Sequence, residues 1–349
     1  MGGIGAGILF ALEGVHDLGR NESRPGRLLD ARDYCKLHIV AHYPAVLLGA
    51  RPGGSDAGFR VLPVGRVGAD AVGRRLREEM EEAGMDTRFV EESPGEPTLF
   101  SVCFLYPDNS GGNITTSASA AAGLTTSDVD RAAESLDART LALALPEAPL
   151  TARLRWLARA GERGALRVAA FTSAEIPEVR AQHALRHLDL VALNEDESAA
   201  LVGAAFPAAD PRAFLDRCAG LVTAESPAAR IVVTAGRRGA WGFEHGRWTH
   251  APALAVTVAS TAGAGDALLG GVLTALALGV PLTRASRRSV AEGVVASALD
   301  LGTLVAAFAV TSPHTIAPDL DLEALLAFAS DQGLTFADPL AGHVGEAVH

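Results

Sequence analysis

Short runs of apolar residues alternate with longer amphipathic stretches along most of this 349-residue chain. The runs have the length of buried strands and lie at residues 8–12, 62–64, 168–171, 188–193 and 231–234. The stretches between them, such as 70–84 and 150–163, carry apolar residues at helical spacing. Strands that alternate with helices in this way pair in parallel and are covered on both faces. The pattern therefore predicts an α/β protein with a parallel sheet flanked by helices.

The composition narrows the class of protein and of partner. Hydrophobic residues make up 48% of the sequence and charged residues 20%, which is typical of a soluble α/β protein. The formal net charge of −11 argues against a nucleic-acid or anionic-membrane partner, because both attract clustered Lys and Arg. No apolar run approaches the ~20 residues of a membrane-spanning helix. Cys35, Cys103 and Cys218 form no C-x-x-C pair, so we expect a cytoplasmic protein without disulfides or a cysteine zinc site.

The chain opens with a glycine-rich segment, GGIGAG at residues 2–7. No strand precedes it and its glycine spacing is wrong for a dinucleotide-binding fingerprint, which argues against a dinucleotide-dependent oxidoreductase. The segment also lacks the basic residues of a secretory signal. We expect a flexible terminus that leads into the first strand.

One segment departs from the strand–helix alternation. Residues 97–106, followed by PDNSGGN and ITTSAS, predict a β-hairpin with a polar turn. Both faces of this hairpin carry apolar side chains, so we expect a β lid that covers a site and contributes to a homodimer contact. We expect one domain over residues 1–334. Its lid is formed by residues 97–118, approximately, and residues 18–33 are a candidate for a second part of the lid. Residues 335–349 are predicted to be a peripheral tail.

The strongest indication of chemistry is STAGAGD, residues 260–266, directly before a long apolar helix. Gly263, Ala264 and Gly265 let the backbone approach a ligand, and the free N–H groups of a helix N-terminus form an anion site. Asp266 adds a negative charge there, which is explained if it removes a proton while the backbone binds phosphate. The alternative is that Asp266 only caps the helix. No G-x-x-x-x-G-K-[ST] phosphate loop occurs in the sequence.

Five stretches spanning roughly residues 60–300 resemble, in order, the motifs of the ribokinase-like (PfkB) carbohydrate kinase family. They are VGRVGADAVGRRLREEMEEAGMDTRFV, PTLFSVCFLYPDNSGGN, VALNEDESAAL, IVVTAGRRGAWGF and STAGAGD. The resemblance implies a doubly wound α/β domain with a small β lid and transfer of the ATP γ-phosphate to a hydroxyl. It implies that Asp266 is the general base and that Gly263, Ala264 and Gly265 form the anion hole.

The same resemblance implies residues for the nucleotide and for Mg²⁺. Asn194 and Glu197 match the family's Asn-x-x-Glu positions, which organise Mg²⁺ near the phosphates. From the residues alone, Asn194 can equally be a helix N-cap followed by acidic residues in the first turn. Thr234, Gly236 and Gly239 match the nucleotide turn, although an ordinary strand-to-hairpin turn would also explain Gly239.

Three residues are candidates for contacts with the acceptor. Asp17 is placed by the resemblance where a first-strand aspartate binds substrate hydroxyls, the alternative being a surface aspartate after the strand. His38 and His42 lie four residues apart, a spacing that can put both rings on one helix face. A metal site would need a third ligand that the sequence does not indicate, so we expect substrate contact rather than metal binding.

The sequence departs from the family pattern at three places. RDYCKLHIVAHYPAVLLGA lacks the Gly-Gly pair and the Asn that bind sugar in the family, and TSAEI replaces an Asp-x-Asn pattern. Ser260 replaces the first Asp of the signature, which argues against a monovalent-cation site and K⁺ activation. We therefore expect an ATP-dependent kinase whose small-molecule acceptor is a sugar, a polyol or a related compound. The alternatives are a nucleoside kinase, which the 5% aromatic content does not favour, and a catalytically silent relative that binds a ligand or a partner.

Overall fold

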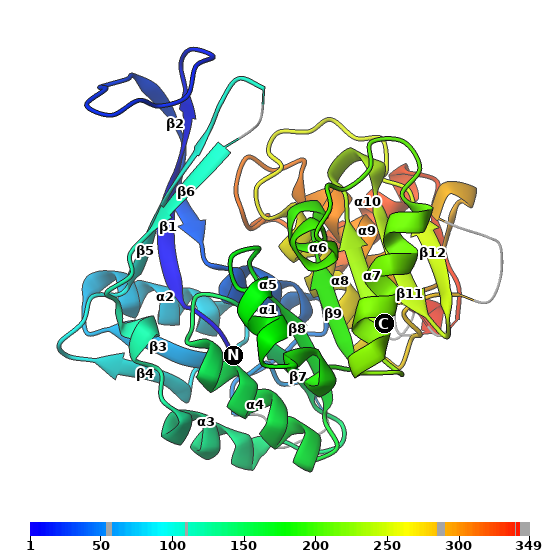
Figure 1. Cartoon of the computed structure of the whole chain (residues 1–349), viewed down its shortest axis with the longest axis horizontal. Coiled ribbons are helices and arrows are strands. Elements are labelled where there is room, and N and C mark those ends of the chain that lie inside the picture. The colour runs from blue at the N-terminus through cyan, green and yellow to red at the C-terminus, as the bar shows by residue number, and fades with distance from the viewer. Residues whose placement is uncertain (54–57, 109–110, 285–289, 339, 343–349) are drawn as a thin grey trace.

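The computed structural model describes residues 1–53, 58–108, 111–284, 290–338 and 340–342. A six-stranded sheet with the order β12-β11-β10-β9-β8-β7 forms its centre (Figure 1). The parallel strands are β7 (Leu141–Ala144), β8 (Leu166–Ala170), β9 (Leu190–Leu193) and β10 (Arg230–Thr234). The antiparallel strands β11 (Ala240–Glu244) and β12 (Arg247–Ala251) extend one edge. The predicted parallel sheet is confirmed, with strand bounds that shift by one or two residues.

Alternate residues of the central strands enter two different hydrophobic cores. Leu190, Ala192 and Val232 belong to one cluster, whereas Val191 and Ile231 belong to the other. This follows from the two-residue period of a strand, which points successive side chains to opposite faces. Both faces of the sheet are therefore covered, and charged residues are rare in these strands for that reason.

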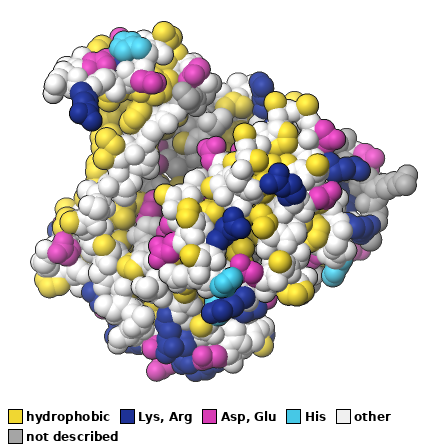
Figure 2. Space-filling view, viewed as in Figure 1, with side chains coloured by type: hydrophobic (Ala, Val, Ile, Leu, Met, Phe, Trp, Pro, Cys, Tyr) yellow, Lys and Arg dark blue, Asp and Glu magenta, His cyan; other side chains and the backbone are white. Residues whose placement is uncertain are grey.

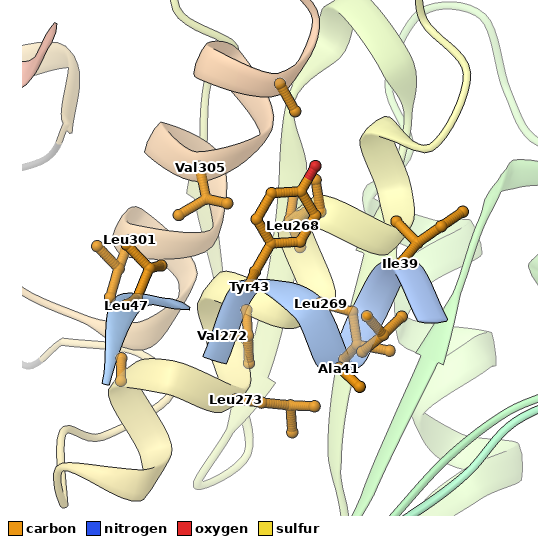
Figure 3. Close-up of a cluster of buried hydrophobic side chains, with 14 of the residues drawn as sticks. Ile39, Ala41, Tyr43, Leu47, Leu268, Leu269, Val272, Leu273, Leu301 and Val305 are labelled. Atoms are coloured by element: carbon orange, nitrogen blue, oxygen red, sulfur yellow. The ribbon is translucent and has the colours of Figure 1, made fainter. Parts of the chain in front are cut away.

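Helices cover each face. The helices that pack into the first cluster are α1 (Lys36–Leu47), α2 (Ala71–Glu82), α8 (Ala264–Ala277), α9 (Ala298–Ala309) and α10 (Leu322–Asp331). Those that pack into the second are α3 (Thr126–Ala132), α4 (Leu150–Glu162), α5 (Ile176–Ala181), α6 (Glu195–Val202) and α7 (Arg212–Glu225). Short 3-10 helices occupy η1 (Ala120–Gly123), η2 (Ala133–Ser135), η3 (Ala184–His187), η4 (Gly236–Arg238) and η5 (Val290–Glu292). Figure 3 shows how α1, α8 and α9 interdigitate around the ring of Tyr43, which fixes the position of α8. No described helix is long and apolar enough to cross a membrane.

A second, four-stranded sheet projects from this α/β body (Figure 1). We call it the small sheet; its order is β2 (Gly26–Tyr34), β1 (Gly5–Leu12), β5 (Leu99–Leu105) and β6 (Gly111–Thr115). The antiparallel pair β5 and β6 is the hairpin that the sequence predicts. The small sheet is thus built from two segments far apart in the chain, β1–β2 and β5–β6.

The N-terminal segment is not flexible, and that expectation is wrong. The Met1 amine donates a hydrogen bond to the Leu143 carbonyl (2.8 Å), and the Gly2 N–H donates to that of Val64 (3.2 Å). The segment therefore links β7 to β3 (Val64–Gly68), which pairs in parallel with β4 (Phe89–Ser93). Its glycines are needed because a Cβ at Gly3 would lie 2.3 Å from the Glu147 Cβ. The predicted strand at 62–64 is β3, which begins two residues later.

The C-terminal segment is partly integrated into the fold. Strand β14 (Thr335–Phe336) pairs with β13 (Val294–Val295), and the side chain of Leu340 is buried. The predicted peripheral tail therefore does not begin at residue 335. Residues 343–349 of that tail lie outside the described residues.

Candidate active site

The N-terminus of α8 has the geometry of an anion site. Gly263 occupies the N-cap position with a φ of +74°, a left-handed conformation that disfavours residues with a Cβ. A Cβ at Gly263 would also lie 2.5 Å from the Thr315 carbonyl oxygen. Because the cap is a glycine, the alternative that Asp266 caps this helix is wrong. Asp266 instead lies in the first helical turn, beside N–H groups that have no intrahelical acceptor.

A lysine lies between Asp266 and a second carboxylate. The Nζ atom of Lys36, the first residue of α1, is 3.8 Å from Asp266 Oδ1 and 3.8 Å from Glu197 Oε1. The exposed fractions of the three side chains are 30% for Lys36, 19% for Asp266 and 8% for Glu197. Figure 2 shows a hollow between the small sheet and the α/β body, with acidic side chains along it. Our sequence analysis missed Lys36. A signal was present, since Lys36 is the only lysine in the sequence.

The electrostatics of this group of residues follow from burial and mutual contact. Burial raises the pKa of Asp266, Lys36 opposes this rise, and the charge of Asp33 adds to it. Burial also raises the pKa of Glu197 against the opposing effect of Lys36. The pKa of Lys36 is itself raised, mainly by Asp266. A carboxylate with a raised pKa is a stronger proton acceptor than an exposed one, which suits a general base.

Asn194 and Glu197 form the capping box of α6. Asn194 Oδ1 accepts the Glu197 N–H (2.8 Å), and Glu197 Oε2 accepts the Asn194 N–H (2.8 Å). The N-cap alternative is therefore what the structure shows for Asn194. The cap leaves Glu197 Oε1 directed at Lys36, so Glu197 also belongs to the site. Among the residues that the structure describes, no three His, Cys, Asp or Glu side chains are grouped to hold a metal.

The turn after β10 brings one of its three predicted residues next to α8. A Cβ at Gly265 would lie 3.7 Å from the Thr234 hydroxyl oxygen, so Thr234 borders the anion site. Gly236 has a φ of +50°, and a Cβ there would meet no atom within 4 Å. Gly239 has a φ of +83°, and its Cβ would lie 2.1 Å from the Ala251 carbonyl oxygen. The turn itself therefore requires a glycine at position 239. This agrees with the alternative explanation of Gly239, an ordinary strand-to-hairpin turn.

Asp17 lies far along the small sheet, in the exposed loop between β1 and β2 (Figure 1). Its carbonyl oxygen accepts a hydrogen bond from Arg24 of the same loop (3.4 Å). The structure does not bring Asp17 to Asp266, because β1 ends at Leu12 and the chain then turns within the small sheet, so a contact of Asp17 with the acceptor stays a prediction. A carboxylate of the small sheet that does lie toward the N-terminus of α8 is that of Asp33 in β2, which is buried and accepts the hydroxyl of Thr315.

His38 is buried and His42 is half-buried. The ring of His38 meets that of Tyr34 edge-on at 4.5 Å between centroids, and His42 meets Tyr43 at 5.6 Å. Burial lowers the pKa of His38 to about 3 and that of His42 to about 4, so both are neutral near pH 7. The ring contacts of the two histidines are with Tyr34 and Tyr43, and none is with Lys36 or Asp266 in the described part of the chain. These tyrosine contacts do not support a substrate role for either histidine.

Glu147, three residues after the end of β7, is a further site residue that our sequence analysis missed. It has a φ of +66°, which is unusual for a residue with a Cβ. Burial raises the pKa of its carboxyl group, and the neighbouring Cys35 thiol and Lys36 oppose this rise. Its Oε2 is buried without a hydrogen-bond partner among the described residues. A backbone strained at the carboxyl end of a parallel strand is the kind of position at which binding residues occur.

The sequence model of the pfkB family of carbohydrate kinases matches residues 53–322. The chain belongs to the pfkB family of carbohydrate kinases. The resemblance stated from its motifs is confirmed, and with it the class of enzyme, a phosphotransferase with a hydroxyl acceptor.

Individual relatives agree with this membership. The chain is 27% identical to the deoxyribokinase of Salmonella typhi over 256 residues, which cover 73% of this chain and 77% of the relative. The nucleoside kinase of Burkholderia thailandensis, solved with inosine, superposes with a TM-score of 0.69 at 17% identity, covering 95% of this chain and 97% of that one. The ribokinase of Arabidopsis thaliana, solved with ribose and ATP, superposes with a TM-score of 0.65 at 18% identity. The superposition covers 94% of this chain and 96% of that one. These superpositions confirm the ribokinase-like fold.

Proposed function

We propose that this pfkB-family kinase transfers the γ-phosphate of ATP to a hydroxyl of a sugar, a polyol or a related small molecule. The observation that carries the proposal is the position of Asp266 in the first turn of α8, beside Lys36 and beside N–H groups that have no acceptor within the helix. A base, an anion site and a cation thereby lie within one small space. Phosphoryl transfer depends on alignment and charge stabilisation, which are what these groups supply.

In the proposed step, Asp266 accepts the proton of the acceptor hydroxyl as its oxygen bonds to the γ-phosphorus. The bond from that phosphorus to the bridging oxygen breaks, and ADP leaves with the electron pair. The N–H groups at the start of α8, following Gly263, stabilise the negative charge on the transferred group. Lys36 exchanges its two carboxylate contacts for the oxygens of the γ-phosphate, so the ammonium moves toward the charge that develops.

The side chains present fit Mg²⁺ bound together with ATP. Glu197 Oε1 would supply one oxygen ligand, which the capping box holds in place, and Asn194 fixes the helix end that carries it. Mg²⁺ retains water and phosphate oxygens and needs only one or two carboxylates from a protein, so the absence of a three-residue cluster among the described residues is consistent with this role. When bound, the ion neutralises charge on the phosphates. Thr234 borders the space proposed for the nucleotide, and the turn that carries Gly236 follows it directly.

We further propose that the small sheet covers the acceptor and that its outer face joins two copies of the chain. Ile8 pairs with Val102, which pairs with Ile114, while Phe10 pairs with Leu28, so these side chains share one face. Ile114 is 67% exposed and Leu28 is 51% exposed. An exposed apolar face of this kind on a sheet is typical of a protein–protein contact.

The direct test is an ADP-release assay with ATP and a panel of sugars, polyols and nucleosides. The panel includes D-ribose, 2-deoxy-D-ribose, D-fructose, glycerol and inosine. Asp266→Asn keeps the shape of the side chain and removes the base, so we expect kcat to fall by about 10²- to 10⁴-fold with ATP binding retained. Wild-type activity that survives this substitution would contradict the role of Asp266. Nucleotide binding without transfer to any acceptor would contradict the proposed function.

A further inference from the structure

Asp33, near the end of β2, is a buried carboxylate without a counterion in the described part of the chain. Its residue is only 7% exposed. The structure gives it hydrogen bonds from a hydroxyl, a thiol and a backbone N–H, but no ion pair. Burying a carboxylate costs free energy unless a counterion and hydrogen bonds offset the loss of water, so a buried carboxylate without a counterion is a candidate for a binding role.

The two oxygens of Asp33 have different surroundings. Oδ1 accepts the Thr315 hydroxyl at 2.6 Å and the Tyr34 N–H at 3.0 Å, so two good donors fix the orientation of the carboxylate. Oδ2 accepts only the thiol of Cys103, at 3.2 Å, among the described donors. A thiol is a weak donor, and a hydroxyl would replace it favourably.

A glycine lies beside Oδ2. A Cβ at Gly7, which pairs with Asp33 in the small sheet, would lie 3.0 Å from this oxygen and 2.9 Å from the Ser101 carbonyl oxygen. A larger residue at position 7 would therefore press on Oδ2, whereas glycine leaves this oxygen uncovered by a side chain of β1. Asp33 also lies beside the N-terminus of α8, because it accepts the hydroxyl of Thr315, whose carbonyl oxygen would lie 2.5 Å from a Cβ at Gly263. The charge of Asp33 raises the pKa of Asp266, which agrees with this placement.

We infer that Asp33 determines which acceptors are used, by accepting a hydrogen bond on Oδ2 from a second hydroxyl of the molecule whose first hydroxyl is deprotonated by Asp266. The inference rests on the proposed function and extends it to the chemistry of the acceptor. The acceptor class is then a polyhydroxy compound, because one molecule must donate to both carboxylates. A compound with a single hydroxyl satisfies Asp266 and leaves Asp33 with the weak thiol.

The test compares Asp33→Asn with Asp30→Asn in the full-length chain. Asp30 is a matched control, since it lies on the same strand, is also buried, and also contacts the loop that carries Thr315, through His314 (3.0 Å). Asparagine at position 33 keeps an oxygen that accepts the Thr315 hydroxyl. It replaces Oδ2, which accepts a hydrogen bond, by an amide nitrogen, which donates one. The binding of D-ribose, 2-deoxy-D-ribose, D-fructose, glycerol and inosine is measured by calorimetry without ATP, and ATP binding separately.

We expect Asp33→Asn to raise the dissociation constant of the tightest-binding probe by roughly 10- to 100-fold, the effect of losing a hydrogen bond to a charged group. Asp30→Asn should change this dissociation constant less than threefold. Neither substitution should change the dissociation constant of ATP. Equal losses in the two variants, no loss at Asp33→Asn, or no binding of any probe would overturn the inference. Asp33-dependent binding of a probe that is never phosphorylated would support the inference and contradict the proposed function. Should Asp33→Asn not fold, Thr315→Val decides instead, because it releases the carboxylate from its fixed orientation and should weaken probe binding; unchanged binding would overturn the inference.

Discussion

Replacement of Lys36 by methionine tests whether this lysine sets the protonation of the proposed base. Methionine is unbranched like lysine but carries no charge, so the substitution removes the ammonium 3.8 Å from Asp266 and from Glu197. At such a distance a unit-charge pair is worth about 1 kcal/mol in bulk water and about 4 kcal/mol at an effective dielectric constant of 20. Because 30% of the Lys36 side chain is exposed, we take a value between these limits.

One pKa unit corresponds to about 1.4 kcal/mol, so we expect the pKa of Asp266 to rise by about one to two units in Lys36→Met. Lys36 favours the charged form of the carboxylate, so its loss keeps Asp266 protonated to higher pH. The acidic limb of the pH profile of kcat/KM for ATP, measured by ADP release, should therefore move to higher pH by the same amount. Lys36→Arg is the control, because it retains the charge and should leave this limb in place even if its rate is lower. An acidic limb that does not move in Lys36→Met would refute the reasoning.

Three other substitutions or conditions test separate parts of the structure. Gly263→Ala places a Cβ 2.5 Å from the Thr315 carbonyl oxygen at a positive φ, so we expect a loss of about 1–3 kcal/mol in unfolding free energy, measured by urea denaturation, and a lower kcat. Ile114→Asp should convert a dimer to a monomer in size-exclusion chromatography with light scattering, and an unchanged mass would argue against the small-sheet contact. The pKa of the buried Met1 amine is lowered to about 5 from 8.0. The unfolded chain therefore binds the extra proton between these values, and stability should rise from pH 5 to pH 8, which acetylation of the amine would abolish.

The parts of the site that can be predicted from the sequence are those whose residues lie in one continuous segment of the chain. STAGAGD places the small residues and Asp266 at a helix N-terminus whatever the rest of the chain does, and the structure shows that arrangement. The fold was predictable for a similar reason, since the apolar runs of β8, β9 and β10 are local signals.

The residues that were missed or misplaced depend on pairing between distant segments. Lys36, Glu147 and Asp33 come together only because the ends of β2 and β7 lie in the same region as the start of α8, and no local pattern encodes that convergence. The structure does not bring Asp17 to Asp266, because the point at which the chain turns after β1 is set by pairing with β2. The glycines near Met1 suggest flexibility when viewed locally, but their small size is what allows the segment to pass between β7 and β3.

The solitary lysine gives this enzyme an unusual chemical handle. Since the Met1 amine is engaged with a carbonyl group in the interior, acylating reagents in solution have one aliphatic amine to attack, and it stands beside the proposed catalytic carboxylate. Its raised pKa means that labelling requires alkaline buffer. A stoichiometric label at this position would count catalytic centres directly, and protection from labelling would report occupancy without any knowledge of the natural acceptor.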